Sequence, residues 1–195
     1  MTVAVVKYNA GNVFSVVTAL ERLGVEPYVT DDSAELQAAS RVIFPGVGEA
    51  GSAMRYLRER GLDTVLKELT VPFLGICLGF QLMCAHSEEG DVECLGIFPA
   101  RVRRLTVSQK VPHVGWSMLA TAEHPVVADL GSSPYTYFVH SYRVDIGDET
   151  IAECLYGEEF AAAAATRNFV GVQFHPEKSG EIGARILRSF LEWKL

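Results

Sequence analysis

The first half of the chain alternates short, continuously apolar segments with amphipathic ones. VAVV (3–6), RVIF (41–44) and VPFLGI (71–76) are apolar throughout, and the stretches between them repeat apolar residues at helical spacing. Strands without a polar face are typical of a parallel sheet covered by helices on both sides. The pattern predicts an α/β fold: a three-layer sandwich with a central mixed, mostly parallel sheet.

Cap and turn signals complete the first half. We predict a helix from residue 13 with an apolar face, stopped by Gly24. The other predicted elements are a strand in VEPYVT (25–30), a short helix capped by Asp32 or Ser33 and ending near Ala39, a turn in PGVGEAG (45–51), and helices through MRYLRER (54–60) and DTVLKEL (63–69).

The second half is predicted to extend the sheet with antiparallel or mixed strands. The candidates are ARVRRL (100–105), YTYFVHSYRVDI (135–146), TIAECLYG (150–157), EEFAAAAATR (158–167) and FVGVQF (169–174). A closing helix (180–195) directs Ile182, Ile186, Leu187 and Phe190 inward. Neither a repeat nor a linker interrupts the chain, so we expect residues 1–195 to form one domain.

Composition excludes several classes of protein. The net charge of -7 argues against nucleic acid as the main partner. The basic cluster Arg101, Arg103 and Arg104 reads as the solvated face of a strand; a patch for a phosphorylated ligand or an acidic partner is the alternative. The four cysteines show neither a CxxC pair nor zinc spacing, so we expect no metal, no cofactor, and reduced thiols in the cytoplasm. Without a signal-peptide pattern or a long apolar stretch, no membrane association is expected.

The segment LGICLGFQLM (74–83) places a cysteine where a strand gives way to a helix. Cys77 stands between Gly75 and Gly79, which is typical of a nucleophile elbow, because side chains there would clash as the backbone turns. The helix that follows directs N–H groups and its positive dipole end at the sulfur, which favours a thiolate. The alternative is a small buried hydrophobe.

A thiol nucleophile needs a base, and the base needs a group that orients it. QFHPEKS (173–179) supplies His175 as base and acid and Glu177 as its orienting carboxylate, at a predicted strand end. The competing histidines are weaker candidates. We expect His86, His113 and His124 to be exposed, His86 at the end of the elbow helix and the others near turns, and His140 to be a structural strand residue whose neighbours line the pocket.

Acyl transfer also needs donors for the developing oxyanion. The N–H of Leu78, directly after the nucleophile, is one predicted donor. The second is the N–H of Val47 in PGVG (45–48), where flanking glycines let a peptide unit approach the substrate or reorient. The alternative is a tight glycine turn that only precedes a helix.

GICLGFQLM together with FHPEKSG resembles the class I glutamine amidotransferases, whose fold is flavodoxin-like. Within that class, residues 8–24, FPGVGEAGSAM (44–54), PHVGWS (112–117) and YFVHSY (137–142) resemble the glutaminase subunits of imidazole glycerol phosphate synthases, which act in histidine biosynthesis. The resemblance implies that Cys77 attacks the carboxamide of L-glutamine and forms a thioester, while His175 protonates the departing ammonia.

The same resemblance implies further roles. Substrate-lining residues would be Gly48, Gln81, Ser141 and Tyr142, and residues facing a partner would be Asn12, Trp116 and Tyr137. The partner would be a (β/α)₈-barrel cyclase subunit that receives the ammonia within a heterodimer. From the residues alone, Trp116 could equally be core. Ser117 departs from the Asn common in the family, which puts one local hydrogen bond in doubt.

Three other functions compete with this one. A different amidotransferase is less consistent with YNAGN (8–12) and PGVG. A thiol peptidase or γ-glutamyl hydrolase would act without a partner. A silent binding subunit would be expected to lack Cys77, His175 or Glu177, and all three are present.

Overall fold

Parallel strands form the centre of the computed structural model, which describes residues 1–9, 12–121 and 124–195. In spatial order they are β2 (Tyr28–Thr30), β1 (Val3–Val6), β3 (Arg41–Phe44), β4 (Phe73–Ile76) and β14 (Phe169–Val172). Their carboxyl ends meet at one edge, where loops gather ligands in sheets of this kind. Because β14 comes from the end of the chain, the edge combines both halves of the sequence.

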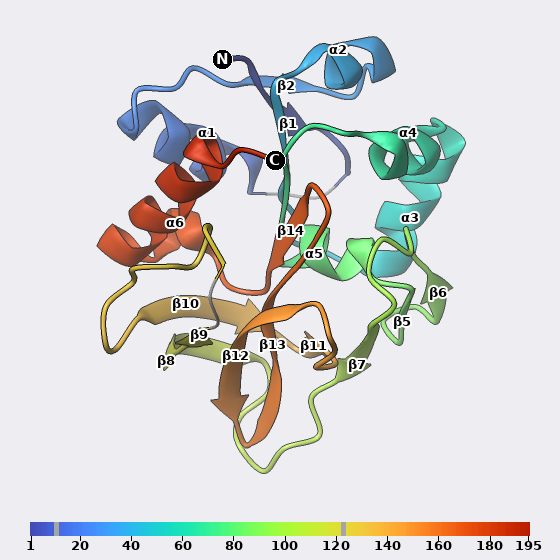
Figure 1. Cartoon of the computed structure of the whole chain (residues 1–195). Helices are drawn as coiled ribbons and strands as arrows, with labels where there is room; N and C mark the ends of the chain where they lie inside the picture. Colours follow the sequence, from blue (N-terminus) through green and yellow to red (C-terminus); the bar gives the residue numbers. More distant parts are fainter. Residues whose placement is uncertain (10–11, 122–123) are drawn as a thin grey trace.

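The sheet continues beyond β14 with mostly antiparallel strands (Figure 1). These are β13 (Glu158–Thr166), β11 (Tyr142–Val144), β7 (Arg101–Arg104), β5 (His86–Ser87) and β6 (Val92–Glu93), while β12 (Thr150–Tyr156) pairs with β13 and with β9 (Ala120–Thr121). A separate two-stranded sheet joins β8 (His113–Met118) and β10 (Tyr135–His140). Over the described residues, the result is a mixed sheet of 12 strands with a small second sheet beside it.

Helices cover both faces of the parallel part (Figure 1). One face carries α1 (Val13–Arg22) and α6 (Gly180–Glu192), which follows the 3₁₀ turn η1 (Pro176–Lys178). The other carries α2 (Ser33–Ala38), α3 (Ala50–Glu59), α4 (Leu62–Glu68) and α5 (Leu78–Met83). Caps fix where two of them begin: Asp32 accepts from two N–H groups of α2, and Glu49 does the same for α3.

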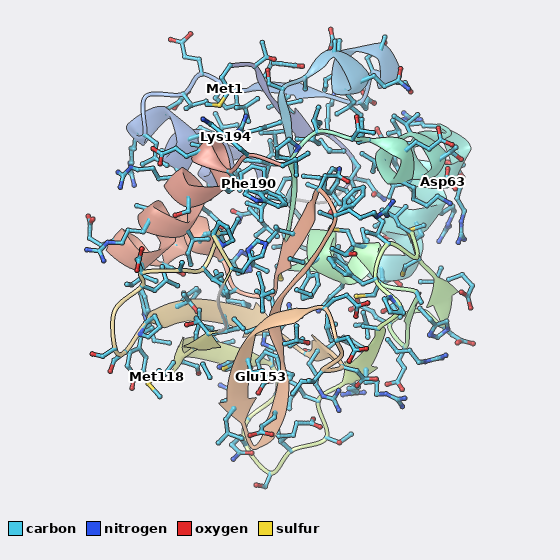
Figure 2. All side chains as sticks on the ribbon, viewed as in Figure 1. Met1, Asp63, Met118, Glu153, Phe190 and Lys194 are labelled. Carbon is cyan, nitrogen blue, oxygen red and sulfur yellow. The ribbon has the colours of Figure 1, made fainter. Side chains whose placement is uncertain are left out.

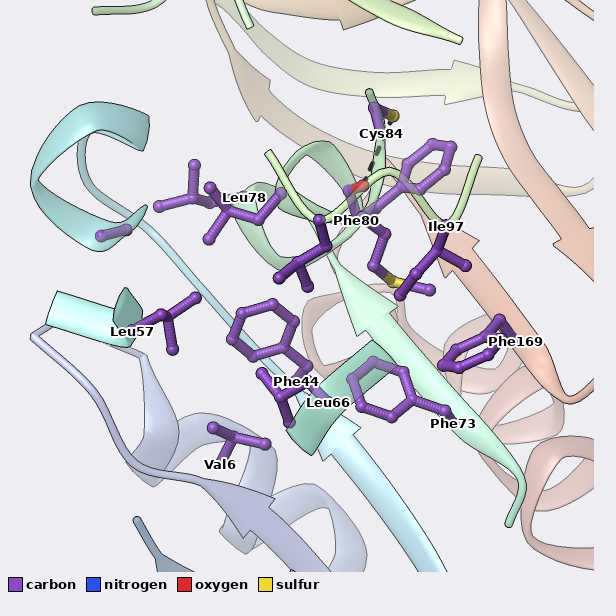
Figure 3. Close-up of a cluster of buried hydrophobic side chains, with 14 of the residues drawn as sticks. Val6, Phe44, Leu57, Leu66, Phe73, Leu78, Phe80, Cys84, Ile97 and Phe169 are labelled. Carbon is purple, nitrogen blue, oxygen red and sulfur yellow. Dashed lines mark hydrogen bonds between the residues drawn. The ribbon is translucent and has the colours of Figure 1, made fainter. Parts of the chain in front are cut away.

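Successive residues of each central strand enter opposite layers of the core. Val3 and Val5 pack under α1 and α6, whereas Ala4 and Val6 face the other helices. In that second layer the rings of Phe44, Phe73 and Phe169 follow one another with centroids 6.0 and 5.3 Å apart (Figure 3). The elbow helix α5 adds Leu78, Phe80 and Leu82 to this layer. The nucleophile region is therefore anchored in the apolar core.

The structure confirms the predicted α/β sandwich with its mixed sheet. The predicted strand 135–146 is wrong as a single element, because the chain turns at Ser141 and its two parts enter different sheets as β10 and β11. The short strands β5, β6 and β9, and β8, which overlaps the segment 112–117, were not predicted. Ala10 and Gly11 of the YNAGN loop lie outside the described residues.

Charged residues of the strand β7 stay at the surface. Arg101, Arg103 and Arg104 are exposed, as predicted for a solvated face, and Arg103 pairs with Asp145 at 2.8 Å and Glu88 at 3.7 Å. These acidic partners weaken the alternative of a phosphate patch. Among the described residues, none of the helices has the length and apolarity to cross a membrane.

Candidate active site

A strained backbone places Cys77 between strand and helix. Cys77 joins β4 directly to α5 with φ 54° and ψ −109°, a conformation costly for a residue with a side chain. Its backbone N–H is held by the carbonyl of Val172 at 2.8 Å, and its carbonyl accepts from Gln81 N at 3.1 Å. The turn is thus secured on both sides, and strain concentrated on a candidate nucleophile is typical of an elbow.

The two glycines around Cys77 are required sterically. A Cβ on Gly79 would overlap the carbonyl oxygen of Phe44, and one on Gly75 would overlap the Met83 sulfur and lie 2.9 Å from Phe80 N. The helix therefore starts in direct backbone contact with β3. This fulfils the steric expectation for the G-x-C-x-G segment.

His175 and Glu177 meet as the sequence predicted. His175 Nδ1 lies 2.8 Å from Glu177 Oε1, and their side chains are 1% and 0% exposed. Asn12, predicted to face a partner, also donates its side-chain amide to Glu177 Oε1. Because a carboxylate oxygen only accepts, Nδ1 carries the proton and Nε2 is the atom left for chemistry. These buried contacts thus fix one tautomer of the neutral ring.

The charge balance around His175 favours a protonated ring. Burial alone would lower the pKa of His175, but the adjoining Cys77 sulfur and the Glu177 carboxylate outweigh it and raise that pKa to about 10. Nε2 is buried and, among the described residues, has no hydrogen-bond partner of ordinary geometry. The ring can therefore hold a proton beside the sulfur and deliver it to a bound group.

A cavity of about 290 Å³ opens at Cys77. Its walls include Gly48, Gln81, Ser141 and Tyr142, the predicted substrate residues, as well as Val47 and Leu78. The size suits an amino acid. Within the described residues, no group of three or more His, Cys, Asp or Glu side chains could hold a metal ion.

The predicted oxyanion donors are not yet arranged to act together. The N–H of Leu78 donates to the carbonyl of Gly46 at 3.2 Å, so a protein oxygen occupies the place of an oxyanion. Tyr8 holds the start of the same loop by donating to the Pro45 carbonyl at 2.7 Å. In this conformation the carbonyl of the Gly46–Val47 peptide therefore occupies the N–H group that was predicted to be the first oxyanion donor.

Two residues near Cys77 were not predicted, Glu89 in the cavity wall and Gln173 behind the sulfur. Glu89 lines the cavity, accepts from the N–H of Ala50 at 3.0 Å, and has its pKa raised by burial. Gln173 is fully buried, with Nε2 3.8 Å from Cys77 Sγ. The sequence did contain a signal for Gln173, because a polar residue stands there between the apolar residues Val172 and Phe174. Nothing around Glu89 distinguished it from a surface carboxylate.

Two histidine predictions are wrong. His86 is buried in β5 beside Arg101 and Asp91, because α5 already ends at Met83. His113 is buried in β8, where it stacks on the rings of Phe138 and Tyr156 and burial lowers its pKa to about 4. His113 Nε2 also lies 2.9 Å from Ser117 Oγ, so Ser117 makes a hydrogen bond within its own strand.

The two remaining histidines differ in how well they were predicted. His140 is a buried strand histidine whose neighbours Val139 and Ser141 line the cavity, as predicted, and His140 lines it as well. Its Nδ1 donates to the carbonyl of Tyr142 at 2.8 Å and its Nε2 lies 3.0 Å from His113 Nδ1. Burial lowers the pKa of His140 to about 3, so the ring is neutral. His124 is half-buried against Trp193 instead of exposed.

An apolar face is exposed on the β8/β10 sheet. Val114, Trp116 and Met118 of β8 alternate outward with exposures of 53%, 54% and 50%, and Figure 2 labels Met118, the last residue of that strand. Across the pair, Tyr137 packs edge-on against Trp116 with ring centroids 5.9 Å apart. Trp116 is therefore a surface residue, and its core alternative is wrong. Contiguous exposed apolar residues of this kind mark interaction surfaces.

Known proteins resemble the chain over nearly its whole length. The family model described as Glutamine amidotransferase class-I matches residues 4–193. Imidazole glycerol phosphate synthase subunit HisH of Bacteroides fragilis is 52% identical over 195 residues, covering 98% of this chain and 100% of that protein. The HisH subunit of Idiomarina loihiensis is 49% identical over 197 residues, with 100% of each chain covered. The structure of PurLQS from Thermotoga maritima includes a chain that shares the fold, with a TM-score of 0.74, 20% identity, and 98% and 97% of the two chains covered.

Proposed function

Because the chain belongs to the class-I glutamine amidotransferase family, we propose that it is the ammonia-supplying glutaminase subunit of an imidazole glycerol phosphate synthase. The observation that carries the chemistry is the succession of Cys77, which lines the cavity, His175, which adjoins its sulfur, and Glu177, which holds His175. The HisH relatives, whose sequences are about 50% identical to this chain, indicate which synthase the subunit belongs to. In this role residues 1–195 act as one domain, and the sheet supports this because its neighbouring strands come from both halves of the chain. The protein acts in the cytoplasm, where thiols stay reduced.

The residues divide the reaction between them as follows. Cys77 Sγ attacks the carboxamide carbon of L-glutamine, and His175 Nε2 gives its proton to the departing ammonia. Glu177 holds Nδ1–H and stabilises the imidazolium. Water then attacks the thioester with His175 as base, releasing glutamate and restoring the thiol. The sum is glutamine plus water giving glutamate plus ammonia.

The cavity walls suit glutamine. The Glu89 carboxylate offers an acceptor for the α-ammonium group, and Gln81, Gly48 and the Ser141–Tyr142 segment offer polar atoms to the rest of the molecule. Ammonia passes to a cyclase partner, which we propose to be a (β/α)₈ barrel. The apolar face around Trp116 and Tyr137 supports docking on the β8/β10 side, with Asn12 close by through its bond to Glu177.

Glutamate release measured with and without the partner tests this function. The chain alone, with its oxyanion position filled by the Gly46 carbonyl, is expected to be slow. Adding a barrel cyclase together with its nucleotide substrate should stimulate release at least tenfold. Equal rates alone and mixed would indicate an independent hydrolase, and no release in either case would indicate a silent binding subunit.

Rotation of the Gly46–Val47 peptide is proposed to be the switch. Val47→Pro removes the second N–H donor, and we expect the partner-stimulated kcat to fall by about 10²–10³, as when one oxyanion donor is lost elsewhere. Val47→Ala keeps the N–H and should stay within about threefold of wild type. The measurement is coupled turnover at saturating glutamine; undiminished turnover by the proline variant would refute the switch.

Glu177 is expected to control the basic limb of the pH profile. The carboxylate helps to raise the pKa of His175 to about 10, so in Glu177→Gln the imidazolium loses its proton at lower pH. We expect kcat to fall about 10- to 100-fold and the basic limb to move down by roughly one pH unit. Glu181→Gln, on the exposed first turn of α6, is the control. If the basic limb of the pH profile does not move in Glu177→Gln, Glu177 does not stabilise the imidazolium of His175.

A further inference from the structure

We propose that Gln173 is a further catalytic residue, whose side-chain amide donates a hydrogen bond to the Cys77 sulfur and supports its ionised form. The proposal rests on the glutaminase function proposed above. Gln173 directly follows β14, two residues before His175, and is completely buried. Its backbone is fixed to β13 by a 2.8 Å bond to the Ala162 carbonyl. Backbone placement therefore aims this amide at the elbow.

The orientation of the Gln173 amide is dictated by its neighbours. Gln81 approaches the Tyr142 carbonyl at 2.8 Å, and because a carbonyl only accepts, the Gln81 atom there must be Nε2. The same Nε2 lies 3.0 Å from the Gln173 amide, which must present its oxygen. The other end of that amide, 3.8 Å from Cys77 Sγ, is then the N–H donor. No flipped arrangement satisfies all three contacts.

The hydrogen-bond network that connects Gln173 to Gln81 ends at the Tyr142 carbonyl. The Tyr142 carbonyl also accepts from His140 Nδ1 at 2.8 Å, so its two acceptor positions are filled by His140 and Gln81. With both hydrogens of Gln81 Nε2 engaged, Gln81 Oε1 is the atom left to accept from a substrate in the cavity. One network thus fixes a substrate contact and a contact to the nucleophile.

The contact to sulfur matters most once the thiol ionises. As a thiol, Cys77 can donate to the Val139 carbonyl at 3.8 Å. A thiolate has no proton for that carbonyl, and two electron-rich atoms then face each other. The Gln173 N–H and protonated His175 can both stabilise the negative sulfur, in addition to the start of α5. Charge-assisted hydrogen bonds are about twice as strong as neutral ones.

Isosteric substitutions separate this role from simple filling of space. Gln173→Met keeps length and volume but cannot donate a hydrogen bond. Gln173→Glu keeps the acceptor for Gln81 and places a carboxylate oxygen against the sulfur. Asn168→Leu is the matched control, because Asn168 is also a buried amide beside β14, but its donors go to the carbonyls of Leu69 and Val71, away from Cys77.

The test is the rate at which iodoacetamide alkylates Cys77 in the full chain at pH 7, followed by peptide mapping so that the other cysteines do not contribute. We expect Gln173→Met to react about tenfold more slowly than wild type and Gln173→Glu more slowly still. In the complex with the cyclase, kcat for glutamate release should fall about 10- to 100-fold with KM within about threefold. Asn168→Leu should lower the melting temperature and leave the alkylation rate unchanged.

Wild-type alkylation rates in folded Gln173→Met would overturn the proposal, and if that variant does not fold, Gln173→Glu decides in the same way. A slowing shared equally by Asn168→Leu would also overturn it, since a general loss of packing would then suffice. Alkylation needs no glutamine turnover. A wild-type chain that releases no glutamate with its partner, yet shows the tenfold effect of Gln173→Met, would refute the proposed function while supporting the contact to sulfur.

Discussion

Replacing Cys77 by Ala is expected to lower partner-stimulated glutamate release by at least about 10⁴-fold, equivalent to about 5.5 kcal/mol of transition-state stabilisation. The loss is this large because no other described thiol lines the cavity, so the thioester route disappears altogether. The measurement is glutamate formation in the complex at saturating L-glutamine. Cys94→Ala, a partly buried cysteine outside the cavity, should retain full activity. Activity of Cys77→Ala within tenfold of wild type would eliminate the covalent mechanism.

The stability of a second variant tests the strained backbone at the same position. Glycine normally destabilises a protein by roughly 0.5–1 kcal/mol relative to alanine. At φ 54° and ψ −109°, however, alanine is strained and glycine is not. We therefore expect Cys77→Gly to melt at no lower temperature than Cys77→Ala, with both inactive. A clearly lower melting temperature for the glycine variant would mean that the elbow is relaxed.

The central sheet was predictable because its strands are buried on both faces. A strand such as VAVV (3–6) must be apolar at every residue when helices cover both sides. Because none of its residues is exposed, the apolar pattern is continuous and easy to recognise. The peripheral strands carry no such signal. β5 and β6 have only two residues each, and β8 carries its large apolar side chains on the exposed face, with His113, Gly115 and Ser117 on the other.

The break at Ser141 illustrates a different limit. Residues 135–146 read as one strand because β-forming residues continue through the break. The chain changes sheets there because β10 pairs with β8 while β11 pairs with β7 and β13. Those are long-range partners that local sequence does not contain. His113 was misjudged for the same reason: its stacking partner Tyr156 and its hydrogen-bond partner His140 come from distant strands.

The site was predictable where chemistry requires a fixed residue type at a fixed topological place. Cys77 and His175 follow neighbouring parallel strands, so their meeting followed from the sheet order. The closed state of the oxyanion loop was not predictable, because it depends on which way one peptide unit points. The bond from Leu78 N–H to the Gly46 carbonyl is one conformation of this loop, and the proposed switch requires a second one of the same sequence.

Replacing Gly79 by Ala is expected to cost about 3 kcal/mol of unfolding free energy or more, a decrease in melting temperature of roughly 6–12 °C for a chain of this size. The added Cβ would overlap the Phe44 carbonyl oxygen, which is backbone and cannot rotate away as a side chain would. Phe44 is paired with Gly75 across β3 and β4, so moving that carbonyl would disturb the pairing of two central strands. The measurement is the difference in melting temperature between the wild-type chain and Gly79→Ala.

Gly147→Ala provides the matched control, because Gly147 is exposed, has no positive φ, and would bring its Cβ only to 3.4 Å from the flexible Glu149 carboxylate. It should change stability by no more than about 0.5 kcal/mol. Gly79→Ala should also lose activity beyond its unfolded fraction, since the helix that shifts carries Leu78 N–H and follows Cys77 directly. Full activity in the folded fraction would mean that elbow geometry tolerates displacement, and equal melting of the two variants would refute the tight packing of α5 on β3.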